Sequence, residues 1–141
     1  MASCLPLALL LTGLLRMIVL MCSVPEYESE YAAGLSKILQ VAKQTGARVT
    51  ILGTTPAHNT GTAADDVTVL ALNKAAAALA SETELPFVDL HTPLIKTCGP
   101  VPWLDNGTNA CSLCAPKCKA LSVHYDSAGY TAIANIIKNS L

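Results

Sequence analysis

The chain has 141 residues, which is enough for one domain of ordinary size and too few for two. Hydrophobic residues make up 52% of the sequence and charged residues 13%, so the chain has the composition of a folded domain and not of a disordered one. The formal net charge is −1 and aromatic residues make up only 4%, so we expect no nucleic acid partner.

The first 24 residues form an apolar segment in which Arg16 is the only charged residue. Three interpretations of this segment are open. The stretch Leu5–Leu15 has the length of the apolar part of a secretory signal peptide, which is the leading interpretation. A membrane span needs about 20 apolar residues and would place Arg16 near the bilayer centre, which is costly. Alternatively, the run Met17–Met21 is a buried strand of the domain itself.

We therefore expect an apolar leader at residues 1–24 and a domain at residues 25–141. The leading interpretation predicts a secreted protein, which touches a membrane only if the leader is not cleaved.

The domain begins with a predicted helix that ends before Gly46. Its apolar residues recur three and four positions apart, which places them on one face: Tyr31, Leu35, Ile38, Leu39 and Ala42. A short buried strand is predicted at Arg48–Leu52. A loop rich in Gly, Thr, Pro and Asn follows at Gly53–Ala63, where ligand sites of α/β proteins usually lie.

A second helix is predicted at Asp65–Ser81 and a second strand at Pro86–Leu90. Two strands joined by a helix form a βαβ unit, so the fold class is α/β with a parallel sheet. After Leu90 we expect a long loop with four cysteines, and then a final helix at Ser127–Leu141. Because a parallel sheet of two strands is rarely stable alone, we expect an incomplete domain whose amino-terminal strands are missing.

The four loop cysteines are Cys98, Cys111, Cys114 and Cys118, and the loop also contains the glycosylation sequon that begins at Asn106. An even number of cysteines beside a sequon favours two disulfides in an oxidising compartment. The alternative is a structural zinc site built from the same four thiolates. Four cysteines allow three pairings, and the sequence does not choose among them.

His124 lies directly ahead of the final helix and is the candidate catalytic residue. An imidazole in a loop can take a proton from a hydroxyl group and return it to a leaving group. The alternative, a histidine packed at the start of a helix, is equally open. His58 and His91 also follow predicted strands, and we expect them to be structural or solvated.

From Tyr27 to Leu141 the chain resembles the carboxyl-terminal half of the SGNH (GDSL-type) hydrolases, which are secreted or periplasmic esterases, lipases and carbohydrate esterases. Four segments carry the resemblance in order: the helix at Tyr31–Gln44, the strand at Val49–Pro56, the segment Phe87–His91 and the motif Val123–Tyr130. The resemblance implies a three-layer, flavodoxin-like α/β fold. It also implies that His124 is the catalytic histidine.

The chain departs from the family pattern in three places. The Gly-Asp-Ser motif of the nucleophile and the glycine and asparagine oxyanion donors have no counterpart, and Leu121 stands where the family has an aspartate that orients the histidine. The resemblance implies hydrolysis of small-molecule or carbohydrate esters without a cofactor or metal, with a complementing amino-terminal half as the partner. The alternative is a secreted, disulfide-stapled binding domain, or truncated pseudoenzyme, without catalysis.

Overall fold

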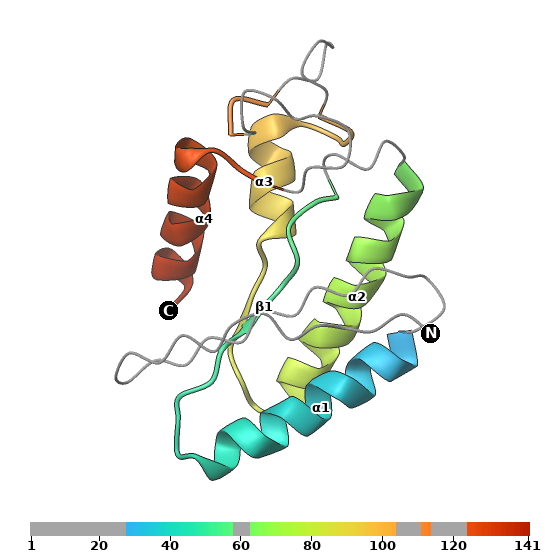
Figure 1. Ribbon diagram of the computed structural model, residues 1–141, viewed down its shortest axis with the longest axis vertical. Coiled ribbons are helices and arrows are strands. Elements are labelled where there is room, and N and C mark those ends of the chain that lie inside the picture. Colours follow the sequence, from blue (N-terminus) through green and yellow to red (C-terminus); the bar gives the residue numbers. More distant parts are fainter. Residues whose placement is uncertain (1–27, 58–62, 104–110, 114–123) are drawn as a thin grey trace.

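The computed structural model describes residues 28–57, 63–103, 111–113 and 124–141, which contain four helices and two strands (Figure 1). The apolar segment at residues 1–24 lies outside this range, so its three interpretations remain predictions. None of the helices within the described residues combines the length and the apolar character needed to cross a bilayer.

Helix α1 spans Glu28–Gln44 and confirms the first predicted helix. It carries acidic residues in its first turn and Lys43 in its last, which matches the direction of the helix dipole. The helix stops because Gly46 adopts a φ of 67° and its N–H donates to the Lys43 carbonyl oxygen at 3.1 Å, a glycine termination. The Lys43 ammonium group also donates to the Thr83 carbonyl oxygen at 3.1 Å, which ties this end of α1 to the segment after α2.

Strands β1 (Ile51–Leu52) and β2 (Phe87–Val88) pair in parallel, with Ile51 opposite Phe87 and Leu52 opposite Val88. Helix α2, at Ala63–Glu82, lies between them in the chain. This arrangement confirms the predicted α/β class and parallel sheet. Both strands are shorter than expected, because the hydrogen-bond ladder runs only from the bond between the Ile51 N–H and the Pro86 carbonyl oxygen, at 2.9 Å, to that between the Gly53 N–H and the Val88 carbonyl oxygen, at 2.8 Å.

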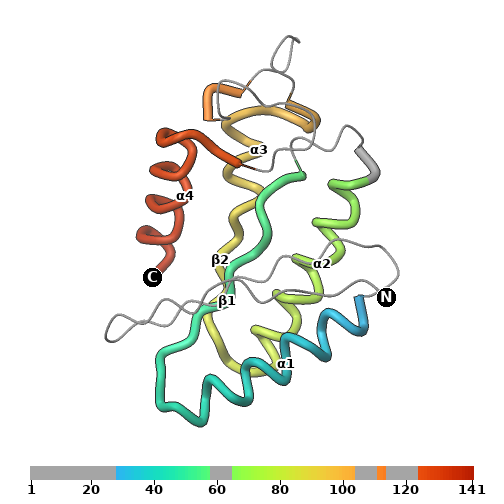
Figure 2. The backbone as a smooth tube through the Cα atoms, viewed as in Figure 1, coloured from blue at the N-terminus to red at the C-terminus, as the bar shows by residue number. Residues whose placement is uncertain are grey.

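Helices α1 and α2 lie together on one side of the strands, and α4, at Ser127–Ser140, lies on the other (Figures 1 and 2). The first core lies between α1, α2 and β1. Ala76 and Ala80 of α2 are almost completely buried in this core. Because their side chains are small, α1 can pack closely against α2. The buried members of this core are Leu35, Leu39, Ala42, Val49, Ile51, Ala76 and Ala80.

Residues 91–98 correct the sequence-based prediction. They form helix α3, His91–Cys98, and not the start of a loop. The Asp89 carboxylate accepts hydrogen bonds from the backbone N–H groups of His91 (2.9 Å) and Thr92 (3.1 Å), which satisfies donors that a helix leaves free in its first turn. Pro93 is tolerated because it stands in that same first turn, where its missing N–H costs no helical bond.

A second core lies between α3, α4 and the segment around Trp103. Its fully buried members are Leu94, Trp103 and Tyr125, and Ile133 and Ile136 of α4 pack against them. The Trp103 indole N–H donates to the Gly99 carbonyl oxygen at 2.9 Å, so its one polar atom is satisfied inside the core.

Candidate functional site

The chain leaves β1 through a backbone segment that a side chain of α2 holds. The buried Asn73 amide donates to the Thr54 carbonyl oxygen at 2.8 Å and accepts from the Thr54 N–H at 2.6 Å. A glycine at residue 53 suits this approach, because a Cβ there would lie 3.0 Å from the Phe87 ring and 3.4 Å from Asn73, so both side chains would have to shift. The position of residues 54–57 beyond the carboxyl end of β1 is therefore set by α2.

A carboxylate–imidazole pair lies where the chain leaves both strands. The Nε2 atom of His91, in the first turn of α3, lies 3.0 Å from each carboxylate oxygen of Asp66, in the first turns of α2. Because a carboxylate only accepts hydrogen bonds, Nε2 carries the hydrogen. The Ala57 N–H donates to the same carboxylate at 3.2 Å. The side chains of His91 and Asp66 are 8% and 13% exposed, so this charge-assisted pair is largely shielded from water.

Tyr125 directly follows His124, and its phenol is close enough to Asp66 for the charge of that carboxylate to affect its pKa. It is 6% exposed, and burial is the largest cause that raises the pKa of Tyr125 to about 12. The nearby Thr55 side chain opposes the shift in pKa, and the charges of Asp66 and Tyr130 add to it. The ring of Tyr125 meets Trp103 edge-on, with centroids 6.4 Å apart. The phenol therefore stays neutral and packed close to the carboxyl end of β1.

His124, the predicted catalytic residue, is exposed and directly precedes the buried Tyr125. Two residues later Asp126 caps α4, because its carboxylate accepts from the Gly129 N–H at 2.7 Å. The Asp126 N–H donates to the Leu113 carbonyl oxygen at 3.2 Å. The imidazole thus projects from a short segment whose next two residues are fixed. A general acid–base needs this combination of an accessible ring and a fixed backbone.

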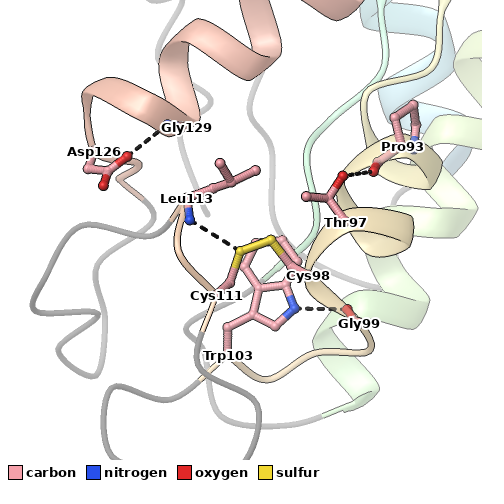
Figure 3. The surroundings of a disulfide bond; sticks show 9 residues. All are labelled: Pro93, Thr97, Cys98, Gly99, Trp103, Cys111, Leu113, Asp126 and Gly129. Atoms are coloured by element: carbon pink, nitrogen blue, oxygen red, sulfur yellow. Dashed lines mark hydrogen bonds between the residues drawn. A yellow bond between two sulfur atoms is a disulfide. The ribbon is translucent and has the colours of Figure 1, made fainter.

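The structure joins two of the four loop cysteines in a disulfide, Cys98–Cys111 (Figure 3). Two of the four thiolates that the zinc alternative requires are thus bonded to each other, which argues against that site. Within the described part of the chain, no cluster of three or more His, Cys, Asp or Glu residues could hold a metal ion. Cys114, Cys118 and the sequon at Asn106 lie outside the described residues, so the second disulfide and the glycosylation remain predictions.

Sequence reasoning did not find the Asp66–His91 pair. In the sequence Asp66 is one residue of a predicted helix, and His91 is a loop histidine that we expect to be structural or solvated. A signal was nevertheless present, because both residues follow the carboxyl ends of two strands predicted to be parallel neighbours. His58, the third histidine, lies outside the described residues.

The described fold is a helix-rich α/β arrangement with a small parallel sheet, and comparison with known proteins gives the same class. No protein-family model matches the sequence, and no curated protein matches it. A crystal structure from Bacteroides fragilis NCTC 9343, described as that of a "putative acylhydrolase", is similar with a TM-score of 0.54 and 22% sequence identity. The likeness covers 80% of this chain and 50% of that one, so this chain spans about half the length of its neighbour. At this identity the likeness concerns the fold alone, and it extends over about half of that protein.

Proposed function

We propose that this chain is the carboxyl-terminal part of an SGNH-type hydrolase that cleaves acyl or carbohydrate-acetyl esters, with His124 as its general acid–base. The observation that carries the proposal is the position of His124. It is an exposed imidazole, two residues ahead of the capped start of α4, next to a tyrosine packed at the carboxyl end of β1. The motif Val123–Tyr130 and the similarity to a protein described as an acylhydrolase support the same class.

In this proposal a serine attacks the acyl carbonyl, and His124 takes its proton and passes it to the departing alcohol. His124 then activates the water molecule that releases the acid. The sequence has no Gly-Asp-Ser motif, so the nucleophile and the oxyanion donors come from a complementing amino-terminal half. The proposal includes a secreted enzyme, because disulfides such as Cys98–Cys111 persist mainly in oxidising compartments.

The test compares the purified chain with a chimera that joins the amino-terminal half of the Bacteroides fragilis protein to residues 28–141. Both are treated with a fluorophosphonate, which reacts with activated serines, and both are assayed with 4-nitrophenyl acetate. We expect labelling and turnover in the chimera, and a loss of turnover by about 100-fold or more in its His124→Ala variant. The exposed Lys138→Ala on α4 is the matched control and leaves turnover unchanged.

Each outcome has a distinct meaning. Labelling of a serine in the chain alone, dependent on His124, would keep the acid–base role and overturn the need for a second half. A folded chimera that is not labelled, or that keeps its turnover after His124→Ala, would overturn the proposal. That result would favour the second candidate, a non-catalytic binding domain stapled by the Cys98–Cys111 disulfide.

A further inference from the structure

The three residues Cys111–Leu113 form a strap across the second core, and the strap is fixed at both of its ends (Figure 3). At one end Cys111 is bonded to Cys98, the last residue of α3. At the other end the Leu113 carbonyl oxygen accepts from the Asp126 N–H at 3.2 Å. Within the strap, the Leu113 N–H donates a hydrogen bond to the Cys111 sulfur, and the nitrogen and sulfur atoms are 3.4 Å apart.

The strap lies directly against the first turn of α4. A Cβ at Gly129 would collide with the Leu113 carbonyl oxygen and would lie 2.7 Å from the Tyr125 Cβ. Residue 129 is therefore a glycine so that the strap can pack against the helix. Because the obstructing atom belongs to the backbone, it cannot move aside by a side-chain rotation, so a side chain at residue 129 would displace the strap or the start of α4.

These contacts form a continuous path from the disulfide to the residues beside His124. The path runs from the sulfur–sulfur bond through Leu113 to Asp126, whose carboxylate holds the Gly129 N–H at 2.7 Å. Tyr125 stands between Asp126 and His124 and belongs to the core against which Cys98, Cys111 and Leu113 pack.

We propose that the Cys98–Cys111 disulfide and the Leu113 carbonyl group are positioning elements for His124. The inference rests on the acid–base role of His124 proposed above. When the disulfide is intact, the strap holds Asp126 and thereby the backbone next to the imidazole. When it is broken, the strap is attached only by weak contacts and the histidine loses its fixed position. The esterase is then sensitive to its redox environment through a site that touches no substrate.

The chemical step is a thiol–disulfide exchange. A dithiol such as dithiothreitol attacks one sulfur, its two thiols close into a disulfide, and two electrons and two protons pass to Cys98 and Cys111, which become thiols. To restrict the reaction to this bond, the test uses a chain in which the other four cysteines, Cys4, Cys22, Cys114 and Cys118, are all replaced by serine.

The first measurement is amide hydrogen exchange on the folded protein, with and without dithiothreitol, and it requires no catalytic activity. We expect reduction to accelerate exchange of the Asp126 and Gly129 N–H groups by a factor about ten times larger than that for the Gly53 N–H, because the bonds that protect them depend on the strap as well as on the stability of the whole fold. The matched control is the Gly53 N–H, which is bonded to Val88 in the sheet and does not touch the strap. The single tryptophan, Trp103, shows by an unchanged emission maximum that the second core remains folded.

An equal change at Asp126, Gly129 and Gly53 would overturn the inference, because it would mean that the disulfide only stabilises the fold as a whole. Unchanged protection at Asp126 would overturn it as well. If reduction of the wild-type bond is incomplete, amide exchange of the Cys98→Ser/Cys111→Ser variant is measured without a reductant. The same comparison of Asp126 and Gly129 with Gly53 then tests the inference.

The second measurement is turnover of the chimera described above with Cys114 and Cys118 replaced by serine. We expect reduction to lower kcat about tenfold and to leave KM unchanged, because the acid–base group is displaced while the binding of the ester is retained. If amide exchange at Asp126 accelerates on reduction but neither the oxidised nor the reduced chimera shows turnover, the proposed function fails and the positioning by the strap stands. If turnover exists and exchange does not respond, the positioning fails and the proposed function stands.

Discussion

Two glycines on helices face opposite environments, so the same substitution is expected to act in opposite directions. Gly34 lies on the exposed side of α1, where a Cβ would meet nothing within 4 Å. Gly34→Ala should therefore stabilise the protein by about 0.5–1 kcal/mol, the usual gain from replacing a helical glycine. Gly129 lies in the first turn of α4, against the strap and the Tyr125 side chain.

At residue 129 the gain in helix propensity is outweighed by two losses. Forcing a methyl group against a backbone oxygen costs about 1–3 kcal/mol. Displacing the strap also weakens the hydrogen bond between Leu113 and Asp126, which contributes about 1 kcal/mol. Gly129→Ala should therefore destabilise the protein by about 1–3 kcal/mol net. The difference between the two variants should be about 2 kcal/mol or more.

Urea unfolding followed by circular dichroism measures both free energies, and the slopes should match the wild type so that only stability is compared. If Gly129→Ala is as stable as Gly34→Ala, the strap does not press against α4 and the path to His124 described above loses one of its contacts.

Four further predictions concern single groups. Reducing the disulfide at Cys98 should lower the free energy of unfolding by about 3 kcal/mol, measured by urea unfolding with and without dithiothreitol; no change would contradict the crosslink. Asn73→Ala should lower the free energy of unfolding by about 1–3 kcal/mol, because it removes the partner of the partly buried Thr54 N–H and carbonyl oxygen; urea unfolding measures the loss, and an unchanged midpoint would refute it. His91→Ala should cost about 1–3 kcal/mol by leaving the Asp66 carboxylate shielded and short of a donor, and its unfolding midpoint tests this. An unfolded tyrosine has a pKa near 10, whereas burial raises the pKa of Tyr125 in the folded protein to about 12. Between these pH values the free energy of unfolding should therefore fall by about 1.4 kcal/mol per pH unit. Tyr125→Phe should remove this loss, and an unfolding free energy with the same pH dependence in both proteins would refute it.

The elements that the sequence predicts well are those whose signals are local. The apolar spacing from Tyr31 to Ala42 defines one helix face, and Gly46 marks its end, so α1 follows from adjacent turns alone. The start of α4 is similarly local, because Asp126 caps it three residues ahead of Gly129. Helix α3 was missed because His-Thr-Pro resembles a turn, and its main support comes from the Asp89 carboxylate, ahead of the helix.

The site depends on distant residues and was predicted only in part. Asp66 and His91 are separated by 25 positions and meet because two parallel strands end at the same edge, so their pairing requires the three-dimensional arrangement. The disulfide is likewise only partly predictable. The number of cysteines predicts that disulfides form, but it does not predict that Cys98 pairs with Cys111. The role of His124 rests on a motif, and the structure adds its exposure and the fixed residues that follow it.

The two hydrogen bonds between Asn73 and Thr54 help to set the register of β1 against β2. A slip of β1 by one residue moves its backbone by about 3.3 Å and turns every side chain to the opposite face. Such a slip would break both bonds to Asn73 and would bring a residue with a Cβ beside the Phe87 ring, where a Cβ at residue 53 would lie only 3.0 Å away. The alignment of the strands is therefore decided largely by α2, so a correctly docked helix is a precondition for a correctly aligned sheet.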